Sequence, residues 1–294
     1  MNIMVTGGDG QLGRCLAQRA EQGLLPSGLK LRCLGQHQLD ITDAEAVNAT
    51  VRRLGPGIVI NAAAWTDVDG AERHVAQAMA VNALGAANVA AATAQYGSRL
   101  FHISTDYVFD GTACHPLDEA AEPRPVNVYG ASKLAGEVAV RREAPGAVIV
   151  RTSWLYSAHG RNFLKTILHS GLQRRALDVV DDQTGCPTSA DDLADALVRL
   201  AQRPRLHAGV YHYSGKDAMT WFDFASRIVE CAARHSPKWA DVQVRRAATS
   251  PQRSPAPRPA YSVLSCEKIS ALDIPLSSLP QRLEPLVASM LKAG

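Results

Sequence analysis

The 294-residue sequence has little of what would assign it to a specialised class of protein. Aromatic residues make up 5% of it, and its formal net charge of +3 is too small to indicate a nucleic-acid or membrane partner. Apolar stretches are interrupted well before ~20 residues, so we expect no membrane-spanning segment. The N-terminus lacks a basic region followed by a cleavage site, which favours a cytoplasmic protein.

Paired spacings of metal-binding or disulfide-forming residues are also lacking. The six cysteines include no CxxC, and the nine histidines have no Cys, Asp or Glu at a usual metal spacing. We therefore expect free thiols in a reducing compartment and no metal site. The 46% of hydrophobic and 20% of charged residues are typical of a soluble globular protein. The length predicts one large α/β unit or about two domains.

The first half of the chain alternates short apolar runs with amphipathic ones. We predict strands at 2–6, 29–34, 58–61, 99–104 and 147–151, and helices at 11–22, 43–54, 76–96 and 129–142. Apolar strands alternating with helices predict a Rossmann-like, doubly wound parallel sheet of the α/β class. We expect a dinucleotide-binding domain over 1–155 and a smaller α/β substrate-binding lobe mainly over 156–294, with some segments returning to the first domain.

A glycine-rich turn separates the first predicted strand from the first helix. Gly7, Gly10 and Gly13 have the spacing that allows a tight turn, close approach to a pyrophosphate and close packing of helix on sheet. Its position at the first strand favours dinucleotide binding over an ordinary strand-to-helix turn. No Asp or Glu lies between Glu21 and Asp40, where a carboxylate would repel a 2′-phosphate, and no arginine clamp is evident. We expect NADPH or NADH as cofactor, with some preference for NADP.

A tyrosine and a lysine lie four residues apart on one predicted helix. Tyr129 and Lys133 share a face, so the ammonium could lower the pKa of the phenol, which is ordinarily ~10. Thr105 follows an apolar strand whose carboxyl end faces the ligand crevice, and its hydroxyl could bond the same substrate oxygen. The alternative for the pair alone is a surface contact worth a few tenths of a kcal/mol.

Together these features resemble the extended short-chain dehydrogenase/reductase family. Within it, several segments are similar to the dTDP-4-dehydrorhamnose reductases, and the similarity covers nearly the whole chain. These segments are 61–69, 104–109, 127–130, 151–154, 182–185, 187–188 and 209–212. The resemblance implies reduction of the C4 ketone of dTDP-4-dehydro-L-rhamnose, a step of dTDP-rhamnose and lipopolysaccharide biosynthesis.

The resemblance also implies a role for individual residues. Tyr129 would donate the proton, and Lys133 would adjust the pKa of Tyr129. The hydroxyl of Thr105 would bond the same substrate oxygen as Tyr129. The cofactor would contact Gly10, Gln11 and Leu12 at the pyrophosphate, Asp40 and Ile41 at the adenosine, and Ala62, Ala63 and Ala64 on its inner face. The sugar nucleotide would contact Thr66, Val68, Asp106, Tyr107 and Trp154. Plain packing is the alternative for Ala62–Ala64, Val68 and Trp154.

Other expectations remain open at this point. Arg245, Arg246, Arg253 and Arg258 could meet the substrate diphosphate or form a solvated basic loop. The chain could form a homodimer, but the magnesium link of some relatives is not expected, because the first helix begins Gly13-Arg14-Cys15. The alternatives for function are a reductase or epimerase acting on another nucleotide sugar, and a non-catalytic regulatory subunit like that of methionine adenosyltransferase.

Overall fold

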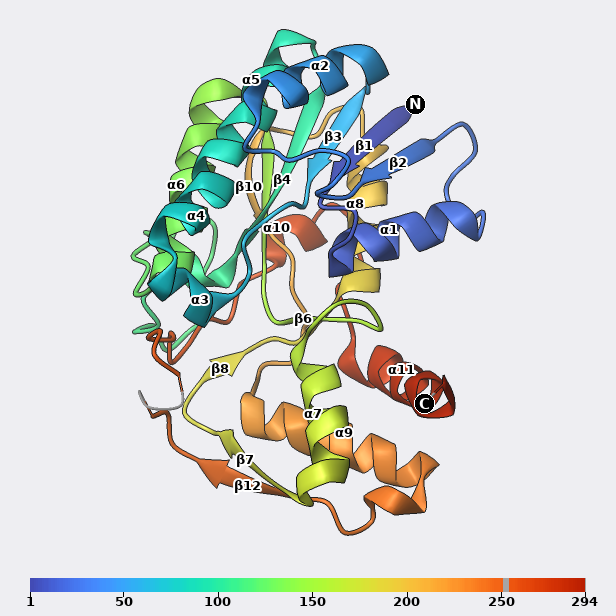
Figure 1. The fold of residues 1–294 in the computed structure, drawn as a ribbon, viewed down its shortest axis with the longest axis vertical. Coiled ribbons are helices and arrows are strands. Elements are labelled where there is room, and N and C mark those ends of the chain that lie inside the picture. The colour runs from blue at the N-terminus through green and yellow to red at the C-terminus, as the bar shows by residue number, and fades with distance from the viewer. Residues whose placement is uncertain (251–253, 294) are drawn as a thin grey trace.

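A computed structural model of the chain describes residues 1–250 and 254–293. Its centre is a six-stranded sheet in the order β10-β5-β4-β3-β1-β2, in which every neighbouring pair is parallel (Figure 1). The strands are β1 (Asn2–Thr6), β2 (Lys30–Leu34), β3 (Ile58–Asn61), β4 (Arg99–Thr105), β5 (Val148–Thr152) and β10 (Gly209–His212). This arrangement confirms the predicted Rossmann-like α/β class.

Helices cover both faces of the sheet because successive side chains of each strand point to opposite sides. Ile3 and Val5 of β1 join one core with the helices α1 (Gln11–Glu21) and α8 (Ala190–Ala201). Met4 joins the opposite core, which also includes residues of three further helices. These are α2 (Ala44–Leu54), α5 (Ala86–Gln95) and α6 (Val128–Glu143). Burial on both faces explains why the strands read as uninterrupted apolar runs.

The helix predicted over 76–96 is continuous but changes geometry along its length. It consists of α4 (Val75–Met79), a π-helical segment (Ala80–Gly85) and α5. The π-helical segment carries the buried side chain of Asn82, whose amide binds the backbone of Trp65 and the hydroxyl of Ser132. By length and hydropathy Val75–Gln95 could cross a membrane, which our reading of the sequence did not expect. Core helices meet the same criteria, and this one packs against α2 and α6.

The second half of the chain builds a lobe with its own core, below the sheet in Figure 1. Its main elements are α7 (Phe163–Arg174), β7 (Ala176–Val180), α9 (Trp221–His235), β12 (Gln243–Ala247) and α11 (Leu279–Ala293). The remaining elements of the chain are short. They are α3 (Val68–Arg73), β6 (Leu155–Tyr156), β8 (Thr184–Gly185), β9 (Thr188–Ser189), β11 (Met219–Thr220), α10 (Glu267–Ser270) and the 3₁₀ turns Asp106–Val108 and Pro237–Trp239.

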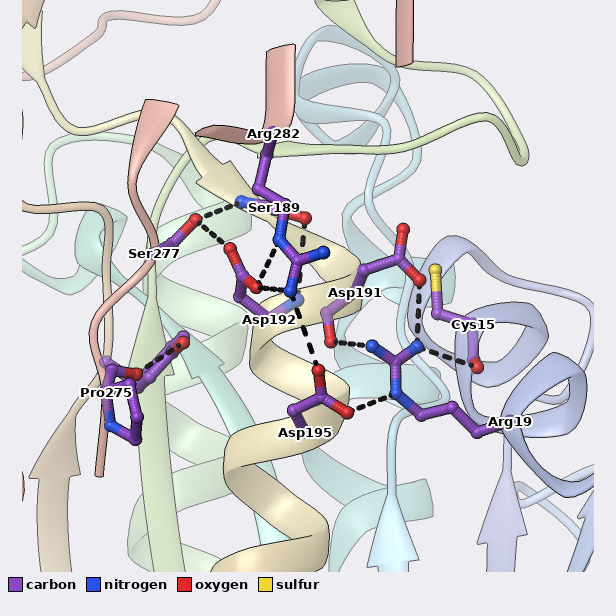
Figure 2. Close-up of polar contacts among 10 residues, drawn as sticks. Cys15, Arg19, Ser189, Asp191, Asp192, Asp195, Pro275, Ser277 and Arg282 are labelled. Atoms are coloured by element: carbon purple, nitrogen blue, oxygen red, sulfur yellow. Dashed lines mark hydrogen bonds and ion pairs between the residues drawn. The ribbon is translucent and has the colours of Figure 1, made fainter. Parts of the chain in front are cut away.

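An ion-pair network joins both parts of the molecule through α8 (Figure 2). On one side of α8, the buried Arg19 of α1 bonds Asp191 at 2.8 Å and Asp195 at 2.5 Å. On the other side, Arg282 of α11 bonds Asp192 at 2.5 Å. Because α1 begins at the glycine-rich turn, this network fixes the orientation of that turn relative to the second lobe.

Candidate active site

A cleft of about 1800 Å³ runs along the carboxyl edge of the sheet, between the sheet and the second lobe. All the site residues predicted from the sequence line this cleft. They are Gly7, Gly10, Gln11, Leu12, Gly13, Asp40, Ile41, Ala62, Ala63, Ala64, Thr66, Val68, Thr105, Asp106, Tyr107, Tyr129, Lys133 and Trp154. Residues far apart in the sequence therefore share one surface, as expected where parallel strands end.

The glycine-rich turn is shaped for close backbone contact. Gly7 has a φ of +68°, and a Cβ on it would lie 2.6 Å from the amide nitrogen of Ala63. A Cβ on Gly13 would overlap the carbonyl oxygen of Gly7, so α1 could not lie as close to β1 with any other residue there. Gly10 is the N-cap of α1 and has no side chain with which to cap the first turn. The free N–H groups of that turn favour an anion, and the residues present fit a dinucleotide pyrophosphate.

A loop from the second lobe closes on the same turn. The side-chain oxygen of Gln11 accepts hydrogen bonds from Asn162 at 2.9 Å and Ser157 at 3.0 Å. Arg161, which lies between them in the sequence, also lines the cleft. Sequence reasoning missed these residues, because contacts between distant loops leave no periodic or spacing signal.

The end of the cleft beside β2 contains a carboxylate that the sequence does not place there. Asp9, in the glycine turn, accepts a hydrogen bond from the backbone N–H of Gln36 at 3.2 Å. Gln36 follows β2 closely, so Asp9 stands where we searched for a carboxylate between Glu21 and Asp40. Asp40 itself accepts bonds from the N–H of Thr42 at 2.9 Å and from its hydroxyl at 2.8 Å.

The tyrosine–lysine pair lies on the first turns of α6. The N-cap Asn127 accepts the N–H of Gly130 at 2.7 Å, and a Cβ on Gly130 would overlap the carbonyl oxygen of Tyr107. Glycine next to Tyr129 therefore lets α6 approach the turn after β4. The rings of Tyr107 and Tyr129 meet edge to face, with centroids 5.8 Å apart.

Burial controls the protonation of the pair in this structure. It raises the pKa of Tyr129 to about 12, a hydrogen bond with Thr105 lowers that pKa, and the charge of Asp106 raises it. Burial also lowers the pKa of Lys133 to about 8, and its ammonium donates to the carbonyl of Ile103 at 2.7 Å. Lowering of the Tyr129 pKa by Lys133 is not among the interactions seen and stays a prediction.

Asp106 is a buried carboxyl held between two hydroxyls. Thr105 donates to it at 3.0 Å and Ser262 at 2.6 Å. Burial raises the pKa of Asp106 to about 7, although both hydrogen bonds lower it. Because a hydroxyl has one proton, Thr105 cannot donate to Asp106 and to a substrate oxygen at the same time.

An aromatic pair forms the wall on the side of the second lobe. Trp154 stacks on Trp221 with ring centroids 3.5 Å apart and planes 6° from parallel. Trp154 has a φ of +46°, uncommon for a large side chain, and a Cβ on Gly185 would lie 2.5 Å from its ring. One face of the Trp154 ring is thus covered by Trp221 of α9, which sequence reasoning missed because the two residues lie far apart in the sequence.

The arginines considered for the substrate diphosphate have different surroundings. Arg258 pairs with Asp69 at 2.8 Å and lines the cleft. Arg246 pairs with Asp181 and its guanidinium lies 4.1 Å from the ring centre of Phe222. Arg245 is exposed, and Arg253 lies outside the described residues. Arg174, which we did not predict, also lines the cleft.

Comparison with known proteins assigns the chain to a family. Residues 1–291 match the profile described as the RmlD substrate binding domain. The chain belongs to this family. A dTDP-4-dehydrorhamnose reductase of Sinorhizobium fredii is 36% identical over 100% of this chain and 99% of its own length. Almost full coverage in both directions shows that the likeness concerns the whole chain.

Two solved structures, each 36% identical to this chain, extend this finding to the fold. The dTDP-4-dehydrorhamnose reductase of Clostridium acetobutylicum superposes with a TM-score of 0.89 at 36% identity, over 99% of this chain and 100% of that one. The enzyme of Bacillus anthracis, solved in complex with NADP, gives 0.88 at 36% identity, over 98% and 99%. The predicted family is therefore confirmed.

Proposed function

We propose that the chain is an NAD(P)H-dependent oxidoreductase that reduces the C4 ketone of dTDP-4-dehydro-L-rhamnose to give dTDP-L-rhamnose. This is the last step of dTDP-rhamnose synthesis. One observation supports the proposal above all: a single cleft combines the glycine turn with Thr105, Tyr129 and Lys133, in a chain whose relatives bear the name of that enzyme.

Tyr129 is the proton donor of the proposed reaction. Its raised pKa keeps the phenol protonated at neutral pH, which is the form that reduction of a ketone requires. A nicotinamide cofactor held in the cleft would supply the hydride, and the phenol of Tyr129 donates its proton to the oxygen at C4. The ammonium of Lys133 stabilises the phenolate that remains and would hold the ribose hydroxyls of the cofactor.

Thr105 can donate a hydrogen bond to the substrate oxygen only when Asp106 is protonated. When Asp106 is ionised, the Thr105 hydroxyl donates to it. When Asp106 is protonated, its own O–H donates to Thr105, whose proton then reaches the substrate oxygen. Because the pKa of Asp106 lies at about 7, both states are populated near neutral pH.

The sugar nucleotide is proposed to lie between the sheet edge and the second lobe. Thr66, Val68, Asp106 and Tyr107 line the sheet side, and Trp154, stacked on Trp221, lines the side of the second lobe. In this proposal residues 1–155 mainly bind the cofactor, and 156–294 mainly bind the substrate. Arg161 and Arg174 are the candidates for the diphosphate, since Arg258 is already paired with Asp69.

The enzyme is proposed to act in the cytoplasm, as a homodimer without magnesium. Nicotinamide cofactors and nucleotide sugars are abundant in the cytoplasm, and free cysteines are typical of a reducing compartment. The acidic residues of α8 already pair with Arg19 and Arg282 (Figure 2). The described residues hold no cluster of three or more His, Cys, Asp or Glu able to bind a metal. Sedimentation with and without a chelator tests the dimer, which should persist unchanged.

The test is turnover by purified protein, followed by the loss of reduced-nicotinamide absorbance. A panel of 4-keto nucleotide sugars with NADPH and NADH should show the highest kcat/KM for dTDP-4-dehydro-L-rhamnose. Tyr129→Phe should bind cofactor normally and lose roughly 100-fold or more in kcat, the usual size of a general acid's contribution. Turnover of another sugar alone would favour a reductase or epimerase that acts on another nucleotide sugar. Capture of a large catalytic partner without any turnover would favour a non-catalytic regulatory subunit.

A further inference from the structure

The glycine turn brings a negative charge to the end of β2. Asp9 lies over the backbone that follows this strand, where its carboxylate accepts the N–H of Gln36 at 3.2 Å. A Cβ on Gly35 would overlap the same carboxylate, so glycine at that position makes room for it. Asp9 and Gln36 both line the cleft, and both are exposed to it.

The end of the second strand is where a doubly wound sheet distinguishes NAD from NADP. The 2′ position of the adenosine ribose lies there, and a carboxylate at this point accepts a bond from the 2′-hydroxyl and repels a 2′-phosphate. Such a carboxylate commonly comes from the strand itself. In this chain β2 is followed by Gly35 and Gln36, and the carboxylate comes instead from the turn between β1 and α1.

Neighbouring side chains do not reverse this charge. Arg14, on the first turn of α1, donates its Nε–H to the backbone carbonyl of Asp9 at 3.0 Å rather than to its carboxylate. The residues of segment 30–42 that line the cleft are Gln36, Leu39, Asp40, Ile41 and Thr42. Asp40 is the one charged residue among them, and it too is acidic. The adenosine end of the cleft therefore combines two carboxylates.

We propose that Asp9 is a specificity-determining residue of the cofactor site, which accepts the 2′-hydroxyl of NADH and disfavours the 2′-phosphate of NADPH. The proposal rests on the proposed nicotinamide-dependent function. The residues of β2 alone predicted some preference for NADPH. Asp9 changes the expected preference to NADH, while both cofactors remain usable. Two like charges about 4 Å apart near a protein surface weaken binding by roughly tenfold or more.

The experiment measures binding of NADH and NADPH to the wild type and to Asp9→Asn, by titration calorimetry without substrate. Asparagine keeps the size and an acceptor for the Gln36 N–H but removes the charge. The wild type should bind NADH roughly tenfold more tightly than NADPH, and Asp9→Asn should bring the two dissociation constants to within about threefold. ADP-ribose and its 2′-phosphate should show the same change, which assigns it to the adenosine end.

Asp110→Asn is the matched control. It removes an exposed carboxylate that also accepts bonds from a nearby turn, with the same change in net charge, but outside the cleft. Its ratio of dissociation constants should equal that of the wild type. Tighter wild-type binding of NADPH, or a ratio that Asp9→Asn leaves unchanged, would overturn the proposal alone. Failure of both dinucleotides to bind would overturn it together with the proposed function.

Discussion

The buried ion pair between Glu137 and Arg151 should contribute strongly to stability. Arg151 of β5 donates through Nε and Nη2 to the two carboxylate oxygens of Glu137, each at 2.8 Å, and both side chains are at most 2% exposed. Ser104 of β4 donates to the same carboxylate at 2.6 Å. Because Glu137 lies one turn after Lys133, these bonds fasten the helix that carries Tyr129 to β4 and β5.

Glu137→Gln should lower the free energy of unfolding by about 3–5 kcal/mol, the usual cost of leaving a buried charge unpaired. Urea denaturation followed by tryptophan fluorescence measures this change. The double variant Glu137→Gln/Arg151→Met should lose about 1–3 kcal/mol less than the sum of the losses of its two single variants. Each single variant leaves one buried charge without its partner, whereas the double variant removes both charges.

An exposed pair provides the control for this experiment. Glu122 and Arg124 pair at 2.5 Å, with side chains 73% and 66% exposed. Glu122→Gln should therefore leave the urea midpoint unchanged, because water screens such pairs. A loss below about 1 kcal/mol for Glu137→Gln, or strict additivity in the double variant, would refute the reasoning.

Three further predictions concern the cleft. Gly13→Ala should abolish measurable NADH binding or destabilise the fold, because its Cβ would overlap the carbonyl of Gly7; calorimetry and thermal melting separate the two effects. Asp106 has its pKa raised from 3.8 to about 7, so its protonated form stabilises the fold. That contribution is complete below pH 3.8 and is lost as the pH rises to about 7. Unfolding free energies of the wild type should therefore fall relative to Asp106→Asn over this interval, and parallel curves would contradict the shift. Trp221→Ala should raise the KM for the sugar nucleotide roughly tenfold with little change in kcat, since it removes the support of Trp154; an unchanged KM would exclude that role.

Local signals in the sequence predicted the sheet well. Five strands of the central sheet begin and end within one residue of the expected positions, because apolar runs bounded by turns have few other interpretations. The sixth, β10, was not expected as a strand, since four residues after an irregular stretch carry too weak a pattern. The π-helical segment around Asn82 was also beyond reach, because it depends on contacts with Trp65 and Ser132.

Long-range pairing determined what could be predicted of the site. Residues that belong to short motifs, such as Gly7 and Tyr129, were found because their spacing is itself the signal. Asp9 and Trp221 were missed because their partners, Gln36 and Trp154, are brought to them by the fold. Pairings of this kind require knowledge of which loops share the sheet edge, and periodicity does not supply it.

The central claim is reduction at C4 of the sugar, and isotope transfer tests it most directly. The protein would be incubated with nicotinamide cofactor deuterated at its reactive carbon and with dTDP-4-dehydro-L-rhamnose, and the product analysed by NMR. We predict one deuterium at C4 of dTDP-L-rhamnose, and a transfer that is slower by roughly 100-fold or more with Tyr129→Phe under the same conditions. Deuterium at another carbon, a product epimeric at C4, or transfer unaffected in Tyr129→Phe would contradict the account.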